Sequence, residues 1–540
     1  MKTTIFFWFA IMAGVGVNQK KRFPTLIILE VMITAALALA VFAPKQNLFA
    51  SLNYLRLIAA FITISLVMFI IVLKSKQLIF PKLNQLLIFL PYVLYLTLRA
   101  LFSTDSQDFM MGNSDRQLGL LTSVACYFFF ISGLVLVINS KPSVLRILVL
   151  IFAMEIAYIS TTFWRAPVPA KSGSFYNINF LSVFLSTLSI VIVTRLMQIP
   201  QKSKVKSFSI LLLCITFILL LAWNGSTQGL AAFFVTFLIY LASKHFQLLL
   251  KVPNFLLIFL SCLFIFFILF IMLMKLPQVS IINGTSFYER LEIYKTSLRI
   301  VGHNIFFGTG IDNFNAGYFR YNFSNNLKLV DNAHSVPLQL LSTVGVIGFA
   351  LWIFVPLKAL TGKNGADEPL FLSLKFGLFS YLVSSLAAIQ VPGTEFLMFF
   401  ICGALLSPHE SQLKISRIQK LILLTPLIFL VLYALNSFLN YNNQTRILSN
   451  FRLGYVSNYR DIRVLEKVMS KEKDLALLFN ESELAIASGD EGFGIKVAHR
   501  MIALAPEDQR TIAAVLRQAE RWNDSGLANL GAKLEREAKG

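Results

Sequence analysis

The sequence has little charge. Only 14% of its 540 residues are charged and 56% are hydrophobic, with a mean hydropathy of +0.70. A soluble domain carries about 25% charged residues, so this composition excludes an ordinary soluble protein and indicates a membrane protein. The formal net charge of +21 would suggest nucleic-acid binding in a soluble chain. Here most of the excess follows from membrane topology, and no nucleic-acid partner is expected.

The sequence also lacks the residue clusters that hold metals and nucleotides. Its four cysteines lie apart in apolar segments, with neither a disulfide framework nor paired metal-ligand spacing, and are expected to be small buried hydrophobes: Cys126, Cys214, Cys262 and Cys402. Asp312 and Asp331 stand alone rather than as a metal-binding pair. Gly308-Thr309-Gly310 lacks the preceding strand and the third glycine of a nucleotide fingerprint. No metal, cofactor or nucleotide is therefore expected.

Long apolar runs dominate what is present. About 14 of them approach the length of a membrane-spanning helix, the first, ninth and thirteenth being the shortest. They cover residues 5–17, 25–43, 57–73, 86–102, 118–138, 144–163, 176–193, 208–223, 230–241, 255–274, 337–357, 370–389, 396–406 and 421–435. The first has no small-residue cleavage site before the basic residues 20–22, so we interpret it as a membrane segment and not as a signal peptide. The sequence predicts an all-α, polytopic bundle of about 12–14 transmembrane helices.

The loops between these runs alternate in charge. Lysine and arginine gather in every second loop, in residues 20–22, 74–82, 141–146, 195–206, 244–251, 358–375 and 414–420. The positive-inside rule places this basic set in the cytoplasm. The polar loop of residues 275–337 and everything after residue 435 then lie on the outer face. We expect a transmembrane domain, residues 1–440, and an outer-face domain, residues 441–540.

The outer-face domain is charged and rich in alanine. Its pattern predicts short amphipathic helices at about residues 475–487, 494–504, 511–522 and 526–539. Ala505-Pro506-Glu507-Asp508 closes an alanine-bearing helix in a way that resembles a tetratricopeptide repeat. About one and a half such units are visible, fewer than a free-standing array needs. They must therefore pack on one another or on the transmembrane domain, and both a binding module and a stabilising cap remain open.

The loop of residues 275–337 is far longer than a connection between packed helices requires, and ordered loops of this length are usually functional. Arg290, Tyr294 and Leu298 share one helical stripe in it. Of the five histidines, His303 and His334 lie on the outer face, and His334 directly precedes the next apolar run. A histidine at such a mouth can act as a general base, with a purely structural role as the alternative.

These loop residues follow a fixed order along the chain. Arg290 is followed four residues later by the aromatic Tyr294, then by Gly308-Thr309-Gly310, and then by His334 before a helix. This order resembles the O-antigen ligase and polymerase family of bacterial membrane glycosyltransferases, which also have many apolar spans and one large outer loop.

Two further segments are similar to the same family: residues 337–348 after the histidine, and a Gly-x-x-x-Asn-x-Asn pattern at residues 173–179. The resemblance covers roughly residues 160–360 in its motifs and most of the chain in hydropathy. It implies a multi-pass protein of the bacterial inner membrane whose site faces the periplasm. The implied reaction transfers a glycan from undecaprenyl diphosphate to an acceptor hydroxyl, with inversion and without metal, nucleotide sugar or other cofactor.

The resemblance also implies roles for two residues. His334 would take the proton from the acceptor hydroxyl, and Arg290 would hold the diphosphate and stabilise the charge that grows on it. The residue types suit these roles, because imidazole exchanges a proton near neutral pH whereas guanidinium stays charged and pairs with phosphate. The acceptor stays open: lipid A core for a ligase, a growing glycan for an O-antigen or exopolysaccharide polymerase, or a protein hydroxyl for a protein O-oligosaccharyltransferase.

The sequence departs from the family pattern at two positions. Family ligases often carry Ser-Arg-Gly at the entrance of a mid-chain span, whereas Gln228 occupies the arginine position here. Ser335 replaces the asparagine that often follows the histidine. Three outer-face cations are candidates to compensate for the missing arginine. The expected substrate-binding set is Tyr294, Gln228, Arg165, Lys171 and Arg320.

A polysaccharide flippase or transporter is the main alternative, because it also needs many spans. Transport favours ionisable groups inside the bilayer and symmetric halves. Glu30, Glu155 and Glu395 are the few candidates, without evident partners, and no repeat relates the two halves. The polar loop with Arg290 and His334 favours an enzyme. A membrane scaffold that acts through the C-terminal domain comes third.

Overall fold

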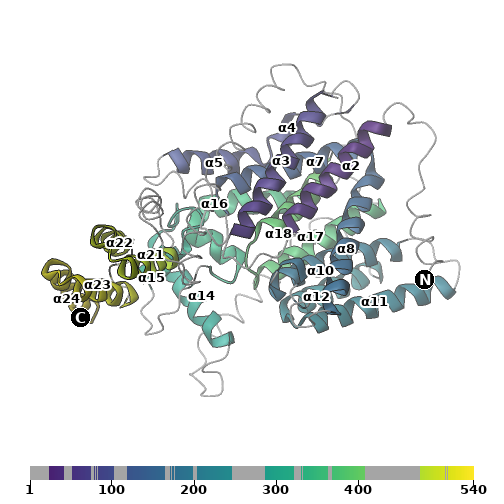
Figure 1. Ribbon diagram of the computed structural model, residues 1–540. Helices are drawn as coiled ribbons and strands as arrows, with labels where there is room; N and C mark the ends of the chain where they lie inside the picture. Colours follow the sequence, from purple (N-terminus) through teal and green to yellow (C-terminus); the bar gives the residue numbers. More distant parts are fainter. Residues whose placement is uncertain are drawn as a thin grey trace.

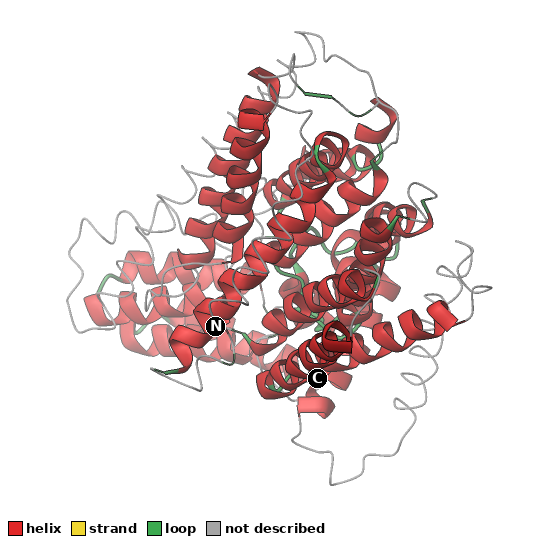
Figure 2. Ribbon diagram, turned by 90° about the vertical axis from the view of Figure 1, so that its right-hand side faces the viewer, coloured by secondary structure: helices red, strands yellow, loops and turns green. Residues whose placement is uncertain are grey.

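The computed structural model describes residues 23–41, 51–73, 78–79, 81, 83–101, 118–164, 171, 173–175, 177–198, 204–245, 286–321, 330, 332–362, 368–407, 475–504, 506 and 509–539. All regular structure in these residues is helical (Figure 2). Four helices are long and apolar enough to cross a membrane, and shorter apolar helices accompany them. The prediction of an all-α membrane protein is confirmed. The expected spans at residues 5–17, 255–274 and 421–435 lie outside the described residues.

The N-terminal half of the bundle is built mainly from long apolar helices, together with a four-residue helix (Figure 1). These are α2 (Phe23–Val41), α3 (Ser51–Leu73), α4 (Leu83–Leu86), α5 (Leu90–Leu101), α7 (Leu120–Asn139), α8 (Lys141–Phe163), α10 (Ile178–Met197), α11 (Lys204–Asn224) and α12 (Thr227–His245). The segment expected as one span at residues 86–102 is divided between α4 and α5. Pro91 stands in the first turn of α5, where its missing N–H costs no hydrogen bond.

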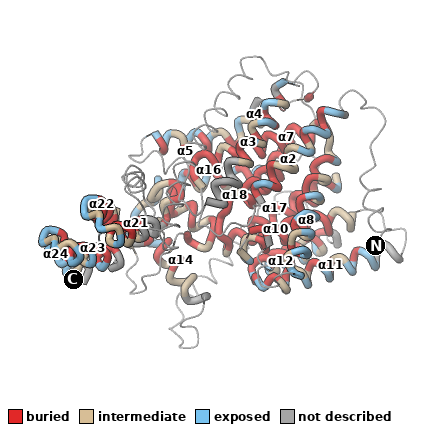
Figure 3. The backbone as a smooth tube through the Cα atoms, in the orientation of Figure 1, coloured by how far each residue is buried: buried red, intermediate tan, exposed pale blue. Residues whose placement is uncertain are grey.

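The C-terminal half of the bundle follows the long polar loop. It comprises α14 (Ser286–His303) and α15 (Phe314–Tyr321) in that loop, then α16 (Val336–Thr361), α17 (Pro369–Ser385) and α18 (Pro392–Leu406). Helices α7 and α18 approach most closely, because glycines face the partner backbone on both sides. A Cβ on Gly403 would lie 1.9 Å from the Phe130 carbonyl oxygen, and one on Gly133 would lie 2.2 Å from that of Phe400. Such small-residue contacts are the usual means by which membrane helices pack, and the helices concerned form the buried interior (Figure 3).

The helix directions fix what meets at each end of the bundle. Ser384, near the end of α17, lies 3.3 Å from Ser186 of α10. Gly377, earlier in α17, packs on Val191, later in α10, so the two helices are antiparallel. The other helices also alternate in direction. As a result, one end of the bundle holds the C-terminal ends of α5, α8 and α17 and the N-terminal ends of α7, α10, α12, α16 and α18. We call this the loop end; of the described residues it carries 164, 171, 173–175, 177, 225–226, 304–321, 330, 332–335 and 386–391.

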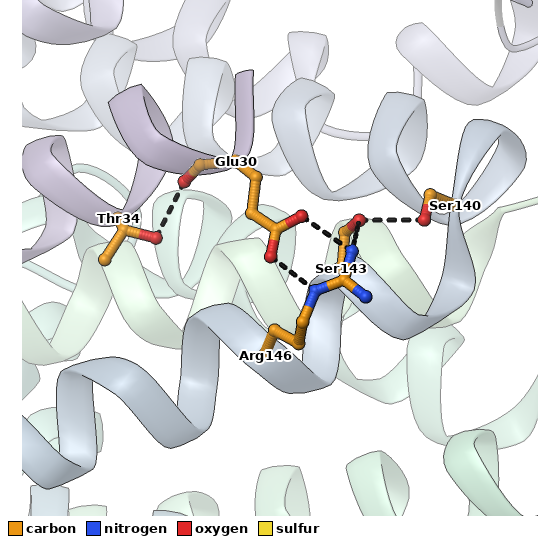
Figure 4. A network of polar contacts seen from close by, with 5 residues as sticks. All are labelled: Glu30, Thr34, Ser140, Ser143 and Arg146. Carbon is orange, nitrogen blue, oxygen red and sulfur yellow. Dashed lines mark hydrogen bonds and ion pairs between the residues drawn. The ribbon is translucent and has the colours of Figure 1, made fainter. Parts of the chain in front are cut away.

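The opposite end, the basic end, gathers the described lysines and arginines of the basic loops. Lys141 forms an ion pair of 2.7 Å with Glu368. Arg146 on α8 makes two hydrogen bonds to the carboxylate of Glu30 on α2, at 2.6 and 2.8 Å (Figure 4). Lys375 donates to the Gly362 carbonyl at 2.7 Å. These described cations belong to loops that the positive-inside rule predicts to be cytoplasmic.

The C-terminal helices are α21 (Leu475–Ser488), α22 (Glu491–Leu504), α23 (Gln509–Trp522) and α24 (Ser525–Lys539), where the sequence predicts helices. Each packs on the next, and α21 also contacts α23. Gly494 allows the close approach of Trp522, since a Cβ there would lie 1.9 Å from the indole ring. The four helices thus pack on one another, and their buried residues Leu478, Phe493 and Met501 belong to the same hydrophobic core cluster as those of the large bundle. Their similarity to a tetratricopeptide repeat stays a prediction.

Candidate functional site

Helix α14 presents two of the candidate residues on one face. Arg290 and Tyr294 are four residues apart, which places them on the same side of the helix. Tyr294 is buried, whereas Arg290 is half-buried. On a neighbouring face Glu292 and Lys295 form an ion pair of 2.7 Å. The helical stripe that the sequence predicts in the polar loop is confirmed.

His334 lies in the short segment before α16 and has a left-handed backbone, with φ 50°. Residues other than glycine seldom adopt this conformation without local support. Its own N–H donates to Asn332 Oδ1 at 2.9 Å, and the preceding Ala333 N–H donates to Gln339 Oε1 at 2.8 Å. Side chains on both sides of the histidine therefore hold the segment, with the half-buried His334 at its centre.

A hydrogen bond joins α14 to this segment. The Tyr294 hydroxyl donates to the main-chain carbonyl of His334 at 3.1 Å. Burial raises the pKa of Tyr294 above its ordinary value, and the charge of Arg290 opposes that change. The phenol therefore stays protonated, and a hydrogen-bond donor, throughout the pH range in which histidine titrates. The structure thus brings Arg290, Tyr294 and His334 together at the loop end.

Helix α16 is broken at Gly345, which has φ 70° and ψ −177°. Because the helical ladder stops there, carbonyl groups in the preceding turn need other donors. The Thr309 N–H donates to the Ser342 carbonyl and the Gly310 N–H to the Thr343 carbonyl, each at 2.9 Å. The turn of residues 308–310 is therefore bound, through two main-chain hydrogen bonds, to the residues that precede the break in α16.

Glycine is required on both sides of this contact. Gly308 has φ 67°, and a Cβ on it would lie 2.3 Å from the Thr343 carbonyl carbon. A Cβ on Gly345 would lie 2.2 Å from the Phe306 carbonyl oxygen. Gly-x-Gly in the loop and the glycine in α16 thus form one docking feature, which places the loop beside the helix that follows His334.

Arg290 also contacts the connection between α17 and α18. Its Nη1 donates to the carbonyl oxygen of Ala387 at 3.4 Å. A guanidinium carries five N–H donors in a fixed fork, and this contact uses one of them. A main-chain carbonyl in the connection of residues 386–391 therefore binds the arginine side chain at the loop end.

A second polar cluster lies where α10 and α12 begin. Ser182 donates to Ser226 at 3.0 Å, and Ser226 donates to Asn179 Oδ1 at 2.9 Å. Gln228 Nε2 donates to the Asn179 carbonyl at 3.1 Å, so its amide donor is directed at α10. Within the described residues no hydrogen bond joins this cluster to Arg290.

The compensating cations predicted from the sequence have different surroundings. Lys171 has an exposed side chain, and its carbonyl accepts a hydrogen bond of 2.5 Å from Asn224, close to the Gln228 cluster. Arg165 lies outside the described residues.

Arg320 belongs to a different part of the loop. Its guanidinium lies 5.7 Å from the ring centre of Tyr321, which in turn stacks on His303. His303 ends α14 and is 13 residues beyond Arg290 (303 − 290), roughly 20 Å along the helix axis. The structure does not bring Arg320 or His303 to Arg290.

The three glutamates in apolar segments, for which the sequence shows no evident partners, have hydrogen-bond partners in the structure. Burying a carboxylate is costly unless hydrogen bonds compensate for the lost water. The partners are Arg146 for Glu30, Ser174 for Glu155, and Tyr381 and Trp352 for Glu395. Charge spacing in the sequence does not reveal these partners, because all but Ser174 and Tyr381 come from distant segments.

The structure adds residues that the sequence does not single out. Asn332 and Gln339 hold the His334 segment, and Ala387 contacts Arg290. An asparagine two residues before the histidine is a recognisable turn signal, since its side chain can bond the main chain two residues on. Ala387 gives no signal, because it is a small apolar residue 97 positions after Arg290.

The described cysteines are buried, as the sequence analysis predicts. Cys126, Cys214 and Cys402 are free and buried, as predicted, while Cys262 lies outside the described residues. In the described part of the chain, no group of three or more histidine, cysteine, aspartate or glutamate side chains is placed to hold a metal ion.

Part of the chain that contains these residues matches a known protein family. Residues 212–353 match the family described as O-antigen ligase. The matched stretch runs from α11 through the Arg290 helix, the 308–310 turn and His334 into the second half of α16. No curated protein matches the chain.

Proposed function

This chain is an O-antigen ligase-related, multi-pass membrane protein, and on that premise we propose that it transfers a glycan from undecaprenyl diphosphate to an acceptor hydroxyl. The observation that carries the proposal is the Tyr294–His334 hydrogen bond. It ties a helix bearing a phosphate-binding residue type to a segment bearing a proton-accepting one. The match to the family described as O-antigen ligase favours the ligase type of reaction, for which lipid A core would be the acceptor; a growing glycan and a protein hydroxyl are the alternatives.

In the proposed reaction His334 is the general base. The acceptor oxygen attacks the anomeric carbon as its proton passes to the imidazole of His334. The bond from the anomeric carbon to the diphosphate oxygen breaks at the same time, with inversion at that carbon. Undecaprenyl diphosphate leaves carrying the electron pair, and His334 later releases its proton to water.

Arg290 is the proposed diphosphate clamp. Negative charge grows on the leaving diphosphate as the glycosidic bond breaks, and a fixed guanidinium beside it lowers the energy of that state. Arginine suits the task better than lysine, because its planar fork pairs with two phosphate oxygens at once. Among the described residues the hydrogen bond to the Ala387 carbonyl uses one of its five N–H groups, which leaves the other four for this purpose.

The proposed orientation puts this site in the periplasm. Arg290 and His334 are at the loop end, whereas the Lys141–Glu368 pair and Arg146 lie at the basic end. The positive-inside rule assigns the basic end to the cytoplasm. A donor glycan carried on the outer leaflet of the inner membrane would then meet the site directly.

The test is a reconstituted transfer reaction. Purified full-length protein in lipid nanodiscs receives an undecaprenyl-diphosphate-linked glycan and, separately, lipid A core, a non-reducing glycan end or a serine-bearing protein. With lipid A core we expect glycosylated product and undecaprenyl diphosphate in equal amounts, also in excess chelator. Product with only the glycan or only the protein acceptor would replace the ligase by the polymerase or the protein transferase. No transfer to any acceptor, together with movement of the intact donor between leaflets, would contradict an enzyme and indicate a flippase.

A further inference from the structure

Glu395 is a buried carboxylate that the proposed reaction does not use. It lies in the first turn of α18 at the loop end, with 1% of its surface exposed. Desolvating a carboxylate in the interior of a membrane protein is costly and is offset only by well-placed hydrogen bonds. The surroundings of Glu395 therefore show what its presence stabilises.

Its hydrogen bonds close the connection between two helices. Tyr381 on α17 donates to Glu395 Oε1 at 2.5 Å, across the turn formed by residues 386–391. Gln390, inside that turn and itself buried, lines the same cavity as the carboxylate. The Glu395 side chain thus binds the helix before the connection and, through its own position in α18, joins it to the helix after the connection.

A second bond ties this unit to the helix that follows His334. Trp352 on α16 donates its indole N–H to Glu395 Oε2 at 3.2 Å. Gln339, which holds the His334 segment through the Ala333 N–H, lines the same cavity of about 20 Å³ as Glu395 and Gln390. The connection of residues 386–391 is therefore fixed relative to α16.

The carbonyl oxygen that binds the Arg290 side chain is part of that connection. Ala387, whose carbonyl accepts the Arg290 guanidinium at 3.4 Å, lies three residues before Gln390. Ala387 binds Arg290 through its main-chain oxygen, so the position of that oxygen depends on the conformation of the connection. We propose that Glu395 is a positioning residue for Arg290: by closing the 386–391 connection onto α16, it sets the guanidinium in register with the His334 segment. The inference rests on the proposed function, in which Arg290 binds the diphosphate.

A double-mutant cycle tests this inference. Binding of undecaprenyl diphosphate is measured for the purified full-length protein with Glu395→Ala, Arg290→Ala and both changes together. We expect Glu395→Ala to weaken binding roughly tenfold, within the range of coupling between residues of one network. In the Arg290→Ala background the same change should weaken binding less than about twofold, because the residue through which Glu395 acts is gone. Glu395→Gln should restore most of the loss, since its amide offers an acceptor to Trp352 and a donor to Tyr381.

The controls separate positioning from stability. Glu30→Gln alters another largely buried carboxylate, paired with Arg146 at the basic end, and should lower the melting temperature without changing binding. If Glu395→Ala does not accumulate in membranes, Gln390→Ala replaces it, since the Glu395–Tyr381 bond then remains. An equal loss of binding in the wild-type and Arg290→Ala backgrounds would overturn the positioning role and leave the diphosphate clamp standing. Binding by Arg290→Ala that equals the wild type would overturn the clamp and this inference with it.

Discussion

The hydroxyl of Tyr294 donates a 3.1 Å hydrogen bond to the main-chain carbonyl of His334. The bond spans 40 residues of sequence and is the direct link between the helix of Arg290 and the segment of the proposed base. It also supports a left-handed backbone at His334, where φ is 50°. The geometry of the proposed site therefore depends on a phenol that does not itself take part in the chemistry.

Removal of that phenol should lower turnover more than donor binding. Tyr294→Phe deletes one hydrogen bond, worth about 1 kcal/mol, and leaves the ring in place. We expect the transfer rate to fall roughly three- to tenfold while the affinity for undecaprenyl diphosphate stays close to the wild-type value. Tyr321→Phe is the matched control, because its hydroxyl contacts Asn304 at the far end of α14. Equal rates for Tyr294→Phe and the wild type would show that the bond does not position His334.

The break in α16 makes a second prediction, on stability. Gly345→Ala forces a side chain into a left-handed position, 2.2 Å from the Phe306 carbonyl oxygen. The loop must then move off the helix, so we expect a cost of more than about 2 kcal/mol and a clear loss of membrane accumulation. Gly302→Ala in α14 is the control, since a Cβ there meets nothing within 4 Å. A melting temperature for Gly345→Ala equal to that of Gly302→Ala would contradict the docking of the 308–310 turn on α16.

Local patterns in the sequence predict the elements of the site better than their assembly. The helix that carries Arg290 and Tyr294 follows from spacing, whereas the roles of Arg290 and His334 follow from the resemblance to the O-antigen ligase family and stay predictions. The break at Gly345 is not predicted, because a single glycine in an apolar run is usually tolerated by a helix. The break is stabilised by a distant segment, because the N–H groups of the 308–310 turn donate to carbonyl groups that lack a helical partner at the break.

The least predictable parts are contacts made through the main chain. Ala387 offers a carbonyl oxygen, which every residue has, so no residue type marks it as the residue that binds Arg290. Glu395 is visible in the sequence as a charge in an apolar run, yet its partners Tyr381 and Trp352 depend on how three helices pack. Gln228 differs from Ala387, because its residue type is compatible with phosphate binding. In the structure, however, its amide N–H donates to the main-chain carbonyl of Asn179.

Gln228 provides a third prediction. Its Nε2 donates to the Asn179 carbonyl, so Gln228→Ala removes a contact between α12 and α10. We expect a lower melting temperature, by an amount equivalent to about 1 kcal/mol, with donor affinity changed less than about threefold. A loss of affinity as large as that caused by Arg290→Lys would instead show that the Gln228 side chain turns to bind the diphosphate.

The orientation of the chain is tested separately from its chemistry. The alternation of basic loops along the sequence predicts that the C-terminal helices lie in the periplasm with His334. A reporter enzyme that folds only after export, fused behind Gly540, should therefore be active, and a reporter that works only in the cytoplasm should be silent. The reverse pair of signals would overturn the proposed topology and move the site to the cytoplasmic face.

The most direct test compares His334→Ala with Arg290→Lys at equal abundance in the membrane, with both transfer and undecaprenyl diphosphate binding measured. His334→Ala removes the proposed base and should reduce the transfer rate on the order of 10²–10⁴-fold, with donor binding nearly intact. Arg290→Lys keeps the charge but loses the fork, so both binding and turnover should fall, with partial activity at best. Wild-type transfer by His334→Ala would contradict the account and exclude this histidine from the mechanism.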